Sequence, residues 1–251
     1  QSGVLGVTGT SSLTAGAAAI TLNNTANSFS GAVSLSNSGL NAVTLDASSA
    51  STLSVGTLNV GTGTLSVQAG SITEAGTGTL VQAAGAGAVS LTVTNTASGA
   101  VLLNTVTGNN LTGPVAVSVP ATSTGNVTLN NGSNALSIGG IGIGMGTGLL
   151  SVSAGAISQS GAITQATAAA GASFSAGANA ITLTNAGNVF TGPVLLSNSG
   201  ANAVQLTDSG ALQLGVSSVG GNLSVSAGGD LSQTGGLTTA TGTTADRKSV
   251  V

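Results

Sequence analysis

A seven-residue motif recurs three times along this chain, and this recurrence constrains the fold more than any other feature. The pattern Asn-x-(Phe/Leu)-(Ser/Thr)-Gly-(Ala/Pro)-Val begins at Asn27, Asn109 and Asn188. Its aromatic or leucine position and its glycine position are occupied by Phe29 and Gly31, Leu111 and Gly113, and Phe190 and Gly192. Similarity at a long, nearly constant period, here about 80 residues, is the sequence signature of stacked repeat architectures.

A second marker keeps a similar spacing. The string Leu-Ser-Val-(Gln/Ser)-Ala-Gly begins at Leu65, Leu150 and Leu223. Apolar and polar residues alternate within it, as in a strand with one buried face, so we expect these three leucines to face inward. We therefore interpret residues 1–245 as a single repeat region with about three units of roughly 80 residues.

Shorter alternating runs subdivide each unit. Between Ile181 and Leu223 the runs start about 10 residues apart, so that two steps take about 20 residues. Gly, Asn, Asp and Ser separate the runs and favour turns. The apolar residues do not recur at the spacing of a helix, which makes every run a candidate strand.

The available side chains suit a narrow core. Two packed sheets need large residues to fill a core about 10 Å thick, whereas this chain has three Phe, one Met and no Trp. Stacked coils need only small aliphatic columns, and each coil completes the backbone hydrogen bonds of its neighbours. The sequence predicts an all-β fold, a parallel β-solenoid and specifically a right-handed β-helix. About 12 coils would form a rod roughly 55–60 Å long at about 4.8 Å per strand.

Charged residues are nearly absent. Residues 1–245 contain no Lys or Arg, and the whole chain contains no His, Cys, Tyr or Trp. Zinc sites and nucleophilic triads therefore lack their residue types, and the missing positive charge argues against a nucleic acid partner. We expect no enzyme, no cofactor and no metal. The acids of this region are Asp46, Glu74, Asp208 and Asp230.

The C-terminal segment, residues 246–251, departs from this composition. Asp246, Arg247 and Lys248 follow one another directly. We expect this segment to be a non-native or linker tail.

Two glycine-rich segments look like ligand loops but have simpler interpretations. Gly139–Gly148 has no P-loop Lys and no helix pattern after it, so we expect a strand with Ile141, Ile143 and Met145 inward and the glycines outward. Gly228-Gly229-Asp230 occurs once, whereas calcium-binding repeats of this type need tandem copies. We interpret it as a turn or cap.

Three strings carry a family resemblance, at residues 183–194, 196–204 and 220–233. They resemble filamentous-haemagglutinin-like and autotransporter-passenger exoproteins, which are β-helical adhesins of Gram-negative bacteria. The resemblance covers residues 1–245 and implies a repeat-region fragment of a secreted or outer-membrane-associated protein at the cell surface. It also implies an outer-membrane secretion partner and a host or cell-surface receptor, and it transfers no binding residue to this chain.

The motif asparagines have two interpretations. Asn27, Asn109 and Asn188 occupy the same place in each unit, where Asn favours turns and hydrogen bonds from its side chain to backbone groups. Such side chains would also form ladders between coils. The alternative role is contact with a ligand.

Three functions from different classes follow. The first is the structural stalk of a surface adhesin, which holds or forms an adhesive surface. The second is an ice-binding solenoid, based on the threonine pairs Thr92/Thr94, Thr105/Thr107 and Thr182/Thr184. The third is a polysaccharide-degrading β-helix with Asp208 and Asp230, separated by about one coil, as the carboxylates. For the isolated chain we also expect end-to-end self-association, because bare strand edges pair with other chains.

Overall fold

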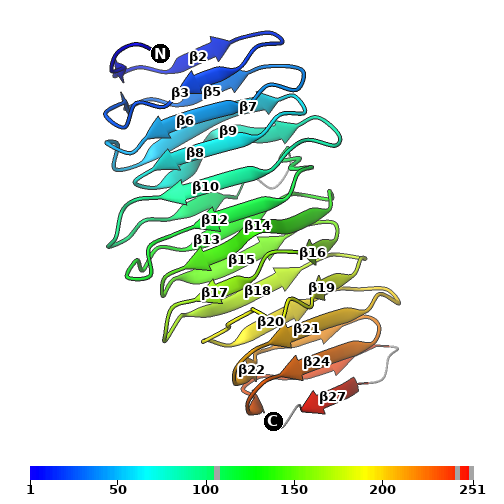
Figure 1. Cartoon of the computed structure of the whole chain (residues 1–251). Helices are drawn as coiled ribbons and strands as arrows, with labels where there is room; N and C mark the ends of the chain where they lie inside the picture. Colours follow the sequence, from blue (N-terminus) through cyan, green and yellow to red (C-terminus); the bar gives the residue numbers. More distant parts are fainter. Residues whose placement is uncertain (105–107, 241–243, 249–251) are drawn as a thin grey trace.

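The chain folds into a stack of parallel strands that runs from the N-terminal end at the top to the C-terminal end at the bottom (Figure 1). The computed structural model describes residues 1–104, 108–240 and 244–248. The predicted all-β parallel solenoid is confirmed, with no helix among the described residues. Accordingly, nothing in these ranges forms a helix with the length and hydropathy needed to cross a membrane.

Two long sheets form the walls of the solenoid. Sheet 1 consists of β2 (Ser11–Thr14), β5 (Val33–Ser36), β7 (Leu53–Val60), β9 (Ile72–Gln82), β11 (Val101–Leu103), β13 (Val127–Asn130), β15 (Leu149–Ser153), β18 (Gly171–Ser175), β20 (Val194–Ser197), β22 (Leu212–Leu214), β23 (Ser217–Val219), β25 (Leu231–Gln233) and β26 (Leu237–Thr239). Sheet 2 consists of β3 (Ile20–Leu22), β6 (Val43–Ala47), β8 (Leu65–Ala69), β10 (Val89–Val93), β12 (Val115–Ser118), β14 (Leu136–Met145), β16 (Ile157–Gln159), β17 (Ile163–Gln165), β19 (Ile181–Leu183), β21 (Val204–Asp208), β24 (Leu223–Ala227) and β27 (Thr244–Lys248). A short third sheet pairs β1 (Gly6–Val7) with β4 (Ser28–Phe29).

Each turn takes one rung from each long sheet, and the described chain makes about 10 turns. The predicted number of about 12 coils was therefore too high. It came from the C-terminal stretch, where turns are short, as in the one from Val204 to its register partner Leu223. The turn from Val89 to its register partner Val115 is longer, because the corners in the middle of the chain hold longer loops.

The repeat unit corresponds to three and a half turns. The motif valine Val33 begins β5 in sheet 1, Val115 begins β12 in sheet 2, and Val194 begins β20 in sheet 1. Seven strand steps separate β5 from β12, and two steps make one turn. Consecutive units therefore place the same sequence on opposite walls, and only every second unit returns it to the same wall.

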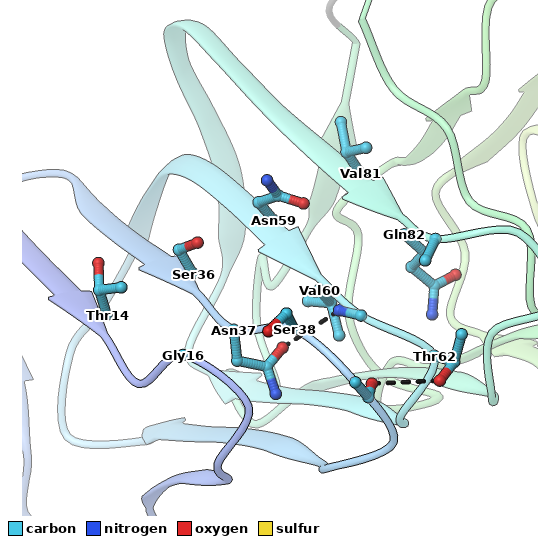
Figure 2. A pocket seen from close by; sticks show the side chains of 13 residues that line it. Thr14, Gly16, Ser36, Asn37, Ser38, Asn59, Val60, Thr62, Val81 and Gln82 are labelled. Carbon is cyan, nitrogen blue, oxygen red and sulfur yellow. Dashed lines mark hydrogen bonds between the residues drawn. The ribbon is translucent and has the colours of Figure 1, made fainter.

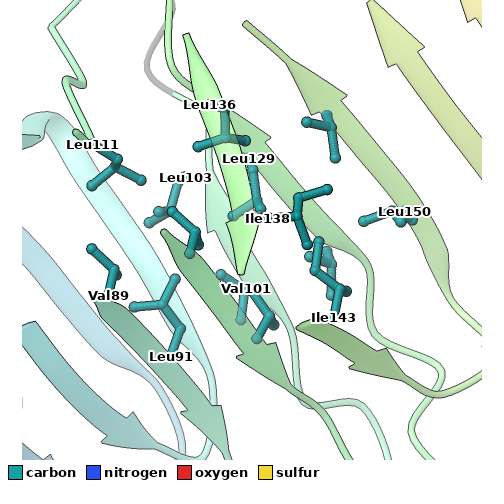
Figure 3. Close-up of a cluster of buried hydrophobic side chains, with 14 of the residues drawn as sticks. Val89, Leu91, Val101, Leu103, Leu111, Leu129, Leu136, Ile138, Ile143 and Leu150 are labelled. Atoms are coloured by element: carbon teal, nitrogen blue, oxygen red, sulfur yellow. The ribbon is translucent and has the colours of Figure 1, made fainter. Parts of the chain in front are cut away.

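The core lies between the two walls as columns of aliphatic side chains (Figure 3). Leu65, Leu150 and Leu223 face inward, and each is at most 1% exposed. Leu65 stands in register with Val43 on one side and Val89 on the other, and both of these valines are fully buried. Burying each such side chain contributes about 1.5–3 kcal/mol, so a core without many aromatic residues still stabilises the rod.

The glycine-rich segment forms part of β14 but differs from the prediction. Ile143 and Met145 are buried as expected, whereas the description covers only the backbone of Ile141. Gly139 and Gly142 do not face outward, since both are buried, whereas Gly144 between Ile143 and Met145 is partly exposed. Gly142 has a φ of +77°, and the pairing of β14 with β12 shifts register at this point, so a β-bulge interrupts the simple alternation.

The backbone of Thr244–Lys248 forms β27 and pairs with β24. In this register Thr244 is opposite Leu223 and Asp246 is opposite Val225. The charged tail thus begins within a strand of sheet 2.

One corner holds a residue in an unfavourable backbone conformation. Ala168 has a φ of +61°, and the equivalent corner of the preceding unit has Gly85 with a φ of +72°. A residue with a Cβ loses about 1–2 kcal/mol in the left-handed region. We expect Ala168→Gly to raise the free energy of unfolding by about 1 kcal/mol and Gly85→Ala to lower it by a similar amount, as measured by urea denaturation. A loss of stability in Ala168→Gly would contradict this interpretation.

Candidate functional site

The motif asparagines connect three successive turns at a corner of the solenoid. Asn27, Asn109 and Asn188 are at most 1% exposed. The Oδ1 atom of each accepts a backbone N–H from the previous turn, at 2.9 Å from Leu5, 2.7 Å from Leu80 and 2.9 Å from Ile163. The Nδ2 atom of each donates to a backbone carbonyl of the next turn, at 3.1 Å to Asp46, 3.0 Å to Asn130 and 2.9 Å to Thr207.

These contacts assign the motif asparagines to the scaffold. Both ends of each amide are used within the chain, and a buried amide has no free face to offer a ligand. The middle copy adds a hydrogen bond of 2.6 Å from Asn109 Nδ2 to Glu74 Oε1. The third copy adds a reciprocal pair with Gln159, at 3.0 Å and 2.7 Å.

The rest of the motif closes the corner. Phe29, Leu111 and Phe190 are buried, and the ring of Phe190 packs edge-to-face on Phe174 with 6.0 Å between centroids. At the glycine position, a Cβ added to Gly192 would lie 2.7 Å from the backbone nitrogen of Gly171 in the preceding turn. Equivalent clashes with the preceding turn arise at Gly31 and Gly113, so only a residue without a side chain fits this close approach.

A second set of asparagines, which sequence reasoning missed, closes short loops. Asn37, Asn131 and Asn198 are buried, and the Nδ2 atom of each donates to the carbonyl four residues later, at 2.8, 2.7 and 2.9 Å. Their Oδ1 atoms accept backbone N–H groups of a neighbouring turn. The offset from Asn37 to Asn198 equals that from Phe29 to Phe190, and this recurrence is the sequence signal for these two asparagines, whereas Asn131 has no such signal.

Two buried glutamines form a third repeated element. Gln82 Oε1 accepts the backbone N–H of Thr112, and Gln165 Oε1 accepts that of Thr191, each at 3.2 Å. Their Nε2 atoms donate to carbonyls within their own loops, at 3.0 and 2.8 Å. Ser11 Oγ is the single buried side-chain polar atom of the described residues without a hydrogen bond. The interior polar groups are thus used to hold turns together.

Among the residues whose burial the structure describes, Asp208 is the one buried ionisable side chain. It is 2% exposed, and its Oδ1 accepts the N–H of Phe190 at 2.8 Å, as Asn131 Oδ1 accepts that of Leu111 in the preceding unit. Its Oδ2 accepts the N–H of Gly210 at 3.1 Å. Burial raises the pKa of Asp208 above its usual value of 3.8, against the opposing effect of these hydrogen bonds.

A shallow groove of about 370 Å³ crosses four turns near the N-terminal end (Figure 2). Thr14, Ser36, Asn59 and Val81 stand in register along it, one from each of four adjacent strands of sheet 1. No ionisable side chain lines this groove. A molecule lying in it would meet hydroxyl, amide and aliphatic groups, and these bind by hydrogen bonds and contact rather than by charge.

The acidic residues do not form a metal site in the described part of the chain. Across these residues, no three His, Cys, Asp or Glu side chains gather closely enough to hold a metal ion. Asp230, in the Gly-Gly-Asp segment, is exposed on the turn after that of Asp208. The carboxylate oxygens of Asp208 are engaged with backbone N–H groups.

The asparagine network predicts a large, specific effect of one substitution. Asn188→Ala leaves the N–H of Ile163 and the carbonyl of Thr207 without their partners, and each such buried group costs about 1–3 kcal/mol. We expect a loss of roughly 3 kcal/mol in the free energy of unfolding, measured by urea denaturation. Asn23 is exposed, so Asn23→Ala should change stability by less than about 0.5 kcal/mol. Equal effects of the two variants would rule out the bridging role.

The buried carboxyl group of Asp208 should make the free energy of unfolding depend on pH. Because its folded pKa is raised, the folded state holds the proton to higher pH than the unfolded state, and the associated stability is lost as pH rises through the folded pKa. The free energy of unfolding should therefore decrease as pH rises from about 4 towards neutrality. Asp208→Asn should remove this contribution, whereas Asp230→Asn at an exposed position should keep it. An unchanged slope in Asp208→Asn would exclude Asp208 as the cause.

Comparisons with known proteins identify the repeats. A model of the family described as repeats of unknown function (DUF5649) matches residues 1–36, 124–197 and 201–249, which together make up more than half of the chain. The comparison with curated proteins gives no match. The comparison with solved structures gives none either. With its three matched segments of one repeat type, this β-solenoid belongs to the DUF5649 repeat family.

Proposed function

We propose that this chain is a stalk segment of a secreted bacterial surface adhesin, where it holds or forms an adhesive surface. The observation that carries the proposal is the continuous core, which runs through about 10 turns without a break between domains. At about 4.8 Å per stacked strand, this stack is a rod about 48 Å long. A rod of this kind gains length in proportion to the number of its repeats.

The outer surface suits such a role. Thr21, Thr44, Ser66 and Ser90 follow one another in register on sheet 2, and all point away from the core. Uncharged hydroxyl columns of this kind neither steer charged ligands nor bind nucleic acid. The family resemblance of the sequence supports an extracellular setting with an outer-membrane secretion partner and a host or cell-surface receptor.

The open ends of the core support the proposed end-to-end self-association of the isolated chain. The partly buried hydrophobic residues that pack against the core lie near the two ends of the stack: Leu5, Val7, Leu13, Ala15, Leu231 and Leu237. A second copy would cover these residues and pair the terminal strands. Sedimentation at increasing concentration would show the association as a growing mass, and a monomer at high concentration would refute it.

Ice binding is the second candidate, favoured by two threonine pairs, Thr92/Thr94 and Thr182/Thr184, whose members are partly or fully exposed. Thr92 follows Leu91 on β10 and Thr182 lies on β19, both in sheet 2. These two strands are four turns apart, so the pairs do not form adjacent ranks. The third pair, Thr105/Thr107, falls outside the described residues. Thermal hysteresis of the purified chain would favour this candidate over the stalk.

The stalk proposal predicts where the chain resides and what its removal does. Antibodies against the purified chain should label intact cells of the bacterium that encodes it, and labelling only after permeabilisation would contradict the proposal. Deleting the segment from the encoded protein should reduce adhesion to target cells and leave surface display intact. An unrelated β-solenoid of equal length should restore adhesion if the segment is a spacer. Failure to restore would assign the adhesive surface to the segment itself.

A further inference from the structure

The two walls of the solenoid carry equivalent sequences at equivalent positions. Under Leu65, Leu150 and Leu223 stand Val43, Val127 and Val204, in register on the adjacent strand. All six side chains are buried to the same degree, with at most 1% exposed. Yet Leu65 and Leu223 belong to sheet 2, and Leu150 belongs to sheet 1. Either wall can therefore hold the same Val and Leu in register on adjacent strands.

The hydrogen bonds of the motif asparagines also change from one wall to the other between consecutive units. Asn27 and Asn188 donate from Nδ2 to carbonyls of sheet 2, in β6 and β21. Asn109 donates to a carbonyl of sheet 1, in β13. On either wall the donor is Nδ2, the acceptor is a backbone carbonyl, and the distance between them lies between 2.9 and 3.1 Å. Both the apolar core and the buried hydrogen bonds therefore tolerate the change of wall.

We propose that the unit of three and a half turns is an interchangeable module, and that gaining or losing one unit turns everything beyond it to the opposite face of the rod. A whole number of turns would leave the direction of the distal part unchanged. A unit of three and a half turns reverses this direction with every added copy. Each copy also lengthens the rod by about 17 Å, at about 4.8 Å per turn. This geometry depends on the fold alone; its consequence for a recognition region beyond the rod rests on the stalk function proposed above.

Insertion of one unit tests the proposal. A second copy of residues 34–115 is placed between Val115 and Ala116, which joins the copies at equivalent motif positions. The chain has no Cys, so spin labels can be attached at Ser66→Cys in the first copy and at Ser151→Cys. Ser66 and Ser151 lie on opposite walls, three and a half turns apart, whereas Ser66 and Ser224 lie on the same wall, seven turns or about 34 Å apart.

The expected result is a match between two distance distributions. In the insertion variant, the 66–151 pair measured by double electron–electron resonance should reproduce the 66–224 pair of the original chain. If the 66–151 distance keeps its original value, the inserted unit has looped out and the proposal is wrong.

A second variant separates face exchange from simple lengthening. Residues 34–194, two units and seven turns, are duplicated after Val194, so that every strand keeps its own wall. Both variants should unfold in a single cooperative transition by circular dichroism. If the two-unit variant folds and the one-unit variant does not, the walls are not interchangeable. Failure of both would show that the units are not modules at all.

Discussion

Each turn lies directly on the one before it, one strand spacing away, and the remaining features of this chain follow from that contact. At about 4.8 Å per turn, the interior has room for columns of Val, Leu and Ile, and the motif glycine position at the corner has no room for a side chain. Gly31, Gly113 and Gly192 stand where the backbone of the previous turn occupies the place of a Cβ. Aromatic residues are few: the chain has three Phe, of which Phe174 stands in such a column, in register with Val152 and Leu196.

The corners raise a second requirement, which the buried amides meet. Where the chain leaves one wall for the other, the regular ladder stops, and its backbone groups need partners of another kind. Asn and Gln side chains supply both a donor and an acceptor and carry no charge into the interior. Asn188 and Gln165 use both functions to connect neighbouring turns. Asp208 can ionise, and because burial raises its pKa, its presence couples stability to pH.

The solenoid and its inward leucines could be predicted because they follow from local alternation, which the sequence displays directly. Leu65, Leu150 and Leu223 are such cases. Features set by contacts between turns could not be predicted in the same way. The bulge at Gly142 and the length of the middle corners depend on the adjacent turn. Of the candidate site, the motif asparagines were visible through recurrence, whereas Gln82 and Asn131 became recognisable only when their partners in other turns were known.

The hydrogen bonds between turns run along the rod, and this direction determines how the rod answers a mechanical load. Pulling on the two ends opens the turns one after another instead of shearing all of them together. A turn of about 23 residues lengthens to roughly 75 Å when extended, in exchange for about 5 Å of rod. In a force–extension trace this release would occur in steps of one turn. Under tension such a segment would act as an extensible tether, which takes up a sudden pull by lengthening before its anchors give way.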